Sequence, residues 1–296
     1  MILNQANLAI LNMGYSAAFQ MGLAASNPIW PRVAMDVPSN TAENAYAWLG
    51  QSTKFREWVG ERVYQNLAQS DYRIKNKTWE DTVSVPREAV EDDQYGVYSK
   101  LMEQLGQDAA NHPDELVFGL LKAGFSTMCH DGQYFFDADH PVGQQGSQVS
   151  VSNYQSGSGA PWFLLCTSKI VKPLIFQKRR PYAFQARTNL TDENVFKANE
   201  FVWGADARNN VGFGLWQTAF ASKADLNEDN YSAAQAAMMN FKNYAGTPMG
   251  ITPELLVVPP SLKTAAEKLV VATTVANGAT NVLANSAKVL VVPWLA

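Results

Sequence analysis

A chain of 296 residues with 47% hydrophobic residues and a formal net charge of -4 has the composition of a globular protein with a sizeable core. Two cysteines are too few for a secreted disulfide framework. The acidic balance argues against nucleic-acid binding as the main function, because the one basic run, Lys178-Arg179-Arg180, is short.

The N-terminal stretch, up to about residue 45, predicts an arm that contains one helix. Small and apolar residues alternate there with amides, and the stretch ends in Pro28, Pro31 and Pro38. It has no basic n-region, and amide side chains interrupt its apolar run. We therefore expect neither a signal peptide nor a membrane span.

Two extended segments follow, FREWVGERVYQNL and DYRIKNKTWEDTVSV, and predict a long charged hairpin. In the second segment Trp79, Val83 and Val85 fall on one face and polar residues on the other. This period of two is typical of a half-solvated antiparallel strand. Because a two-stranded hairpin is marginally stable alone, it requires a partner surface.

Apolar residues recur at three and four positions beyond Pro86, which predicts a long amphipathic helix. Asp92 or Asp93 is expected to cap its N-terminus, which accounts for the acidic run at 91–93, although such carboxylates could also bind a cation. Pro113 is expected to kink the helix or restart it, and Gly124 to end it.

The remainder predicts an α+β fold with a mixed sheet. A stretch rich in Gly, Ser and Gln, residues 143–161, indicates an exposed loop or domain boundary. Strand-like runs follow it, then a helix from about residue 229, the strand LLVV, a helix near Ser261 and the strand VLVV.

The stretch MCHDGQYFFDADHP is the most enzyme-like part of the chain. Its side chains suit zinc or another divalent ion, so that a metal-dependent hydrolase is one hypothesis. Against it, no helix carries two histidines at i and i+4, and D-G-Q and D-H-P are typical of turns. A structural loop is the favoured interpretation, with no catalytic, cofactor-binding or metal-binding residue predicted. The residues concerned are Cys129, His130, Asp131, Asp137, Asp139 and His140.

Many blocks of the chain, in order, resemble the major head subunit of Mu-like tailed bacteriophages and prophages. They include REWVGERV, DYRIKNKTWEDTVSVPREAVEDDQYGVY, HPDELVFGLLKAGF, DGQYFFDADHPV, KPLIFQKRRP, LLVVPPSL and VVPWL, and extend from about Trp48 to the last residues. The resemblance implies a Hong Kong 97-like phage capsid fold. Its parts would be an N-terminal arm (1–47), an E-loop β-hairpin (48–91), a P domain with a long spine helix (92–160), and an A domain with the remaining P-domain strands (161–296).

The same resemblance implies a function in assembly and no enzymatic activity. A major capsid protein would self-assemble as pentamers and hexamers into an icosahedral head around double-stranded DNA, without sequence-specific DNA binding. The implied partners are further copies, a separate scaffold and protease, the portal and decoration proteins, with no membrane. The implied location is the virion, and the host cytoplasm during assembly. An encapsulin-like or tail-tube assembly protein is the alternative within the same class.

Contacts between subunits are expected on the hairpin, where aromatic side chains would pack on a neighbour and charged ones would pair with it. Some of these aromatics could instead pack on their own chain. The candidates are Arg56, Glu57, Trp58, Val59, Glu61, Arg62, Tyr72, Ile74, Lys75, Lys77, Trp79 and Glu80, with Pro86, Asp92 and Asp93 at the joint to the helix.

Overall fold

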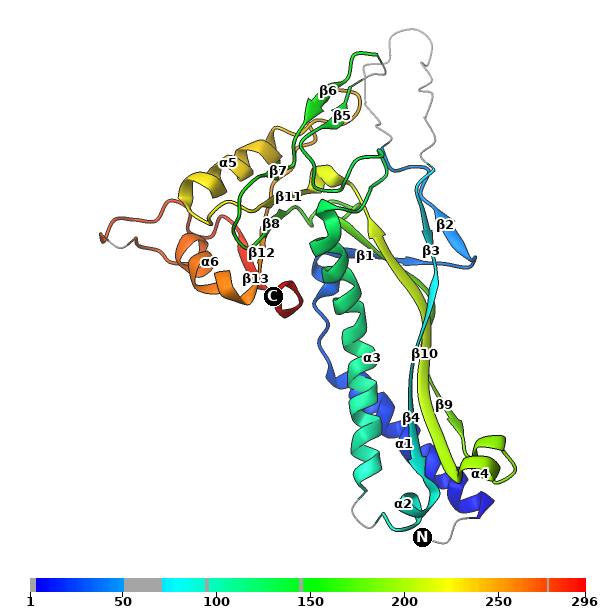
Figure 1. Cartoon of the computed structure of the whole chain (residues 1–296). Helices are drawn as coiled ribbons and strands as arrows, with labels where there is room; N and C mark the ends of the chain where they lie inside the picture. Colours follow the sequence, from blue (N-terminus) through cyan, green and yellow to red (C-terminus); the bar gives the residue numbers. More distant parts are fainter. Residues whose placement is uncertain (1–3, 51–70, 94–95, 144–145, 276) are drawn as a thin grey trace.

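The computed structural model describes residues 4–50, 71–93, 96–143, 146–275 and 277–296. It consists of an elongated part, built from two long helices and a long sheet, and a lobe at one end of it (Figure 1). The elongated part contains α1 (Gln5–Ala25), α3 (Val97–Lys122) and a four-stranded sheet. The lobe contains a five-stranded sheet with α5 (Glu228–Met239) and α6 (Lys263–Val270).

The long sheet has the strand order β1-β9-β10-β4. Its strands are β1 (Ala34–Pro38), β4 (Lys77–Pro86), β9 (Leu174–Arg187) and β10 (Glu200–Phe213). β10 runs antiparallel to both β9 and β4, while β1 pairs parallel with β9. On β10 buried residues alternate with partly exposed ones, and Phe201, Trp203 and Ala205 belong to the core shared with the helices.

The strand predicted to end at Pro86 is confirmed, with Val85 buried and Trp79 and Val83 half-buried. The strand that pairs with it in the structure is not the one that was predicted. Lys77 to Pro86 pair with Asn209 to Glu200, more than 100 residues later, whereas the expected partner segment, 55–67, falls outside the described residues. Within the described residues, the preceding strand β3 (Arg73–Lys75) pairs with β2 (Glu43–Ala45).

The single helix predicted in the N-terminal stretch is confirmed as α1, and it packs along α3 of its own chain (Figure 1). The Asn4 side chain caps it by accepting a hydrogen bond from the Asn7 amide at 2.9 Å. Leu8, Tyr15 and Phe19 are buried in the core beneath it. The segment Gln5–Arg32 is long and apolar enough to cross a membrane, a test that a core helix of a soluble protein also passes.

The predicted long helix is confirmed as α3, but its beginning differs from the prediction, and of the two predicted effects of Pro113 the restart is absent while the kink stays a prediction. Asp92 is the C-cap of the short helix α2 (Arg87–Glu91), and Gly96, with a φ of 66°, is the N-cap of α3. Asp93 still accepts hydrogen bonds from the amides of Gly96 and Val97. The helix does not restart at Pro113, because burial of that turn against the rest of the chain outweighs one lost hydrogen bond.

The lobe is a mixed sheet of order β13-β12-β8-β11-β7, as the α+β prediction requires. Its strands are β7 (Tyr154–Gln155), β8 (Trp162–Leu165), β11 (Ala219–Ser222), β12 (Leu255–Val258) and β13 (Lys288–Val291). β8, β11 and β12 are buried along their whole length. Their core continues to Phe118 and Leu121 at the end of α3, whereas Phe19, Leu105 and Trp203 belong to a separate core in the elongated part.

Short elements complete the chain. They are η1 (Trp30–Arg32), η2 (Ala123–Phe125), β5 (His140–Val142), β6 (Val149–Val151), α4 (Glu193–Ala198), η3 (Trp216–Thr218), η4 (Pro260–Leu262) and η5 (Pro293–Leu295). The turn η2 contains Gly124, which confirms the predicted end of the long helix.

Candidate functional site

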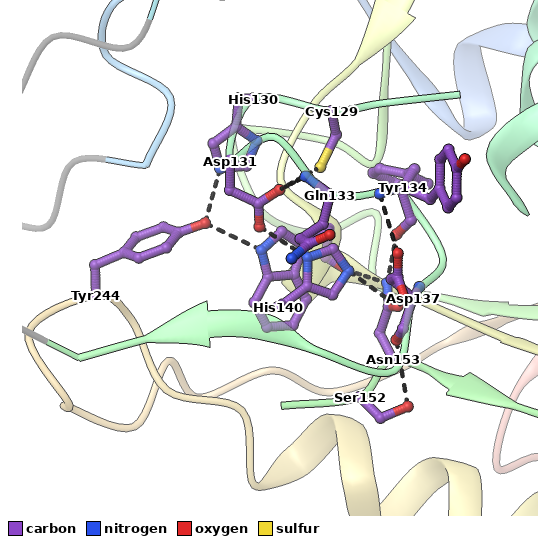
Figure 2. Close-up of polar contacts among 12 residues, drawn as sticks. Cys129, His130, Asp131, Gln133, Tyr134, Asp137, His140, Ser152, Asn153 and Tyr244 are labelled. Atoms are coloured by element: carbon purple, nitrogen blue, oxygen red, sulfur yellow. Dashed lines mark hydrogen bonds and ion pairs between the residues drawn. The ribbon is translucent and has the colours of Figure 1, made fainter. Parts of the chain in front are cut away.

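The loop between η2 and β5 brings three of the predicted ligand-type side chains together (Figure 2). The donor atoms of Cys129, Asp131 and His140 all lie within 4.8 Å of one another. The Asp131 carboxylate bonds to both neighbours, at 2.7 Å to His140 Nδ1 and at 3.0 Å to Cys129 Sγ. Each of the three groups is therefore already bonded within the protein.

His140 lies at the centre of this network and is fully buried. Its ring stacks on Trp216 with centroids 4.0 Å apart, and Nε2 lies 3.2 Å from Asn153 Oδ1. The Asn153 amide nitrogen donates to the Phe135 carbonyl, which fixes the side-chain oxygen toward the histidine. Both ring nitrogens of His140 therefore face an oxygen atom, Nδ1 that of the Asp131 carboxylate and Nε2 that of the Asn153 amide.

The electrostatics around Asp131 keep it ionised. Burial alone raises its pKa, but the hydrogen bonds and charge of His140, with the bond from Cys129, lower it to about 2. The opposite holds for Cys129, where burial and the adjacent Asp131 carboxylate raise the pKa of the thiol well above its usual range. Since a metal binds the thiolate, this environment opposes metal binding at Cys129.

His130 belongs to the same network through a second bridge. Its Nε2 atom lies 2.8 Å from the Tyr244 hydroxyl, which accepts a hydrogen bond from Trp216 Nε1 at 3.0 Å. Tyr244 therefore links His130 to Trp216 (Figure 2). Burial lowers the pKa of His130 to about 4, so the ring is neutral near pH 7.

The two remaining ligand-type residues lie outside the three-residue group. Asp137 accepts from the amides of Tyr134 and Ala138, which is turn chemistry, and Asp139 is exposed. This stretch is therefore a loop held together by hydrogen bonds within the chain. Sequence reasoning missed Asn153, Trp216 and Tyr244, which come from distant segments and carry no motif.

The hairpin candidates fall into three groups. Arg56, Glu57, Trp58, Val59, Glu61 and Arg62 lie outside the described residues. Tyr72 and Ile74 make contacts within the single chain, and their contact with a neighbour stays a prediction: Ile74 is 3% exposed in a cluster with Tyr46, and the Tyr72 hydroxyl accepts from the Phe213 amide at 2.7 Å. For Tyr72, packing on its own chain is the alternative left open for the aromatic side chains.

Four hairpin candidates remain on the described surface. Lys75, Lys77 and Glu80 are exposed, and Trp79 is half-buried. The Trp79 ring meets His112 of α3 edge-on at 4.7 Å, and its Nε1 donates to the Asn209 carbonyl at 3.3 Å. This side chain therefore joins the β4 edge of the sheet to the long helix.

Comparison with known proteins identifies the family. The model of the Mu-like prophage major head subunit gpT matches residues 8–295 of this chain. The chain belongs to the Mu-like major head subunit family. It is 42% identical over 289 residues to the major capsid protein of Escherichia phage Mu, a match that covers 95% of each chain.

Solved structures agree with this membership in the Mu-like family. A chain from the procapsid of bacteriophage JBD30 is 44% identical, with a TM-score of 0.87 over 99% of this chain and 100% of that one. A chain from the JBD30 capsid decorated with minor capsid protein trimers is 35% identical, with a TM-score of 0.80 over 94% of each chain. The function of this Mu-like head subunit is that of a major capsid protein of a tailed phage.

Proposed function

We propose that many copies of this chain form pentamers and hexamers that close into an icosahedral shell around double-stranded DNA. The observation that carries the proposal is the match of 99% of the chain to a JBD30 procapsid subunit. Such a shell is stable because the free energies of many contacts between subunits add. Each subunit touches several neighbours, and about 1.4 kcal/mol per contact changes each association constant tenfold.

The proposal assigns the parts of the fold to a Hong Kong 97-like plan. α3 would be the spine of the P domain, 92–160, and residues 48–91 would form the E-loop, of which β3 and the β4 strand are described. The N-terminal arm, 1–47, would include α1, and 161–296 would contain the A-domain lobe. The mixed sheet of the lobe and the long α3 support this division.

The role we propose is structural, without a chemical reaction. The one ligand-type group in the described residues, Cys129, Asp131 and His140, is bonded internally and buried. We propose further copies as the main partner, with a separate scaffold, protease and portal during assembly in the host cytoplasm. Trimeric minor capsid proteins decorate the JBD30 capsid, and a similar decoration protein fits this shell.

Electron microscopy of the expressed chain tests the proposal. Negative-stain images of purified particles are expected to show closed shells of the size of a phage head. Tubes would instead favour a tail-tube protein, and small uniform cages an encapsulin-like compartment. Soluble monomers under every condition that assembles relatives would overturn the proposal.

A further inference from the structure

A groove of about 280 Å³ lies between the β4 edge of the long sheet and α3. Trp79 from β4, His112 from α3 and Tyr182 from β9 form its aromatic wall. These rings hold one another in place: the Trp79 and His112 centroids are 4.7 Å apart, and those of His112 and Tyr182 are 5.9 Å apart. The groove is therefore preformed in the single chain.

The lining of this groove is strongly acidic. Asp81 enters it from β4, and Asp108 and Glu115 from α3, whereas no Lys or Arg lines it. Glu80 also borders the groove, but its carboxylate accepts a hydrogen bond from Thr82 at 2.6 Å, on the other face of the strand. In the described part of the chain, Asp81, Asp108 and Glu115 form no ion pair, and Asp108 accepts one hydrogen bond, from the Gln104 amide at 2.9 Å. Lys77 lies over the Trp79 ring with Nζ 5.9 Å from its centroid.

The histidine in the wall does not offset this charge. The Tyr182 hydroxyl lies 2.6 Å from His112 Nδ1 and accepts a hydrogen bond from the Asn209 amide at 3.2 Å. Burial lowers the pKa of His112, so that the ring is neutral near pH 7. An aromatic ring beside unpaired carboxylates is the chemistry that holds an ammonium or guanidinium group.

The opposite edge of the same sheet carries the complementary charge. β1 covers β9 only from Leu174 to Lys178, which leaves Arg179 to Arg187 as an edge in the described structure. Arg179 is exposed at the start of this edge, and the side chain of Lys178 is exposed at the last position that β1 covers; among the described residues neither forms an ion pair. The sheet thus presents an acidic edge at β4 and a basic edge at β9.

We propose that the acidic groove receives a basic side chain from a second copy of this chain, supplied by Lys178 and Arg179 on the β9 edge of that copy. The inference rests on the proposed function, since it requires copies to lie side by side. The two surfaces differ, so the contact is heterologous, and repeating it generates a closed ring when the rotation allows. The basic run singled out in the sequence then serves subunit contact.

Charge reversal on both edges tests the contact. The groove variant carries Asp108→Lys and Glu115→Lys, the edge variant carries Lys178→Glu and Arg179→Glu, and a combined variant carries all four changes. Matched controls are Asp225→Lys and Lys242→Glu, exposed residues of the lobe. Each variant is expressed where the wild-type chain forms shells, and shell yield is measured by sedimentation. Thermal unfolding by circular dichroism verifies that each variant folds.

The groove and edge variants are each expected to lower shell yield about tenfold, and the combined variant to restore it to within about twofold of wild type. Both controls are expected to assemble normally. Normal yields from the groove and edge variants, or no restoration in the combined variant, would overturn the inference. A defect confined to the groove variant would assign the groove to another chain and also overturn it. Absence of shells from the wild-type chain would refute the proposed function instead.

Discussion

Gly106 on α3 lies against Phe19 on α1 so closely that a Cβ atom at position 106 would overlap the Phe19 carbonyl oxygen. Gly22 on α1 stands in the same relation to the carbonyl oxygen of Glu103 on α3. The two helices therefore meet backbone to backbone at two reciprocal glycines. This close approach allows Leu8, Tyr15 and Phe19 to enter one core with Met102 and Leu105.

Gly106→Ala is expected to destabilise the chain. Forcing a methyl group into this contact costs about 1–3 kcal/mol, more than the roughly 1 kcal/mol that alanine contributes through helix propensity. Urea unfolding followed by circular dichroism measures the net change.

Gly119→Ala is the matched control for this experiment, since position 119 lies in the same helix and a methyl group added there would meet no atom within 4 Å. It is expected to leave stability unchanged or to raise it by up to about 1 kcal/mol. Equal effects at positions 106 and 119 would contradict the close contact between the helices.

The sequence predicted the helices but could not predict this contact. The apolar pattern of α3 can be read within one segment of the sequence. A glycine inside a helix lowers helix propensity, and the sequence alone does not show which other helix packs against it. The strand β4 was predicted for the same local reason, and its partner β10 was not, because pairing across more than 100 residues leaves no local pattern. Asn153, Trp216 and Tyr244 escaped notice around the His140 network for this reason too.

The buried carboxylate of Asp114 joins α3 to the turn after α1, and its loss is expected to destabilise the chain. Asp114 is 2% exposed and accepts from the amides of Ile29 at 3.0 Å and Trp30 at 2.6 Å. Asp114→Ala leaves these amides without an acceptor, at a cost of about 1–3 kcal/mol. Asp114→Asn keeps one acceptor oxygen and is expected to lose less.

Chemical denaturation of both Asp114 variants measures the difference. Glu115→Ala, at the exposed neighbouring position of the same helix, is the control and is expected to stay within about 0.5 kcal/mol of wild type. A loss at Glu115 as large as at Asp114 would contradict the assigned role of the buried carboxylate.

The stability of the chain is expected to fall as the pH drops from about 6.5 to about 4. Burial lowers the pKa of His130 from 6.5 to about 4, so the unfolded chain binds a proton in this window before the folded chain does. The corresponding loss is about 3 kcal/mol. Asp131, with its pKa lowered to about 2, adds a further loss only below about pH 4.

Urea unfolding at pH 7 and pH 4.5 measures this dependence, and His130→Gln is expected to flatten it. His112, whose pKa burial also lowers, retains its own share of the slope in that variant. His112→Gln therefore serves as the comparison. An unchanged slope in His130→Gln would show that His130 titrates normally in the folded chain.

Both cysteine thiols are expected to be unreactive in the folded chain. Cys129 is 5% exposed and Cys166 is fully buried, and burial together with Asp131 raises the pKa of the Cys129 thiol. Because the thiolate is the reactive and metal-binding form, a disulfide reagent at pH 8 should label neither cysteine until denaturant is added. Elemental analysis of the purified chain should find no stoichiometric zinc for the same reason. Rapid labelling of native protein that is absent in a Cys129→Ser variant would contradict this prediction. It would show an accessible Cys129 thiolate and so favour the metal-dependent hydrolase.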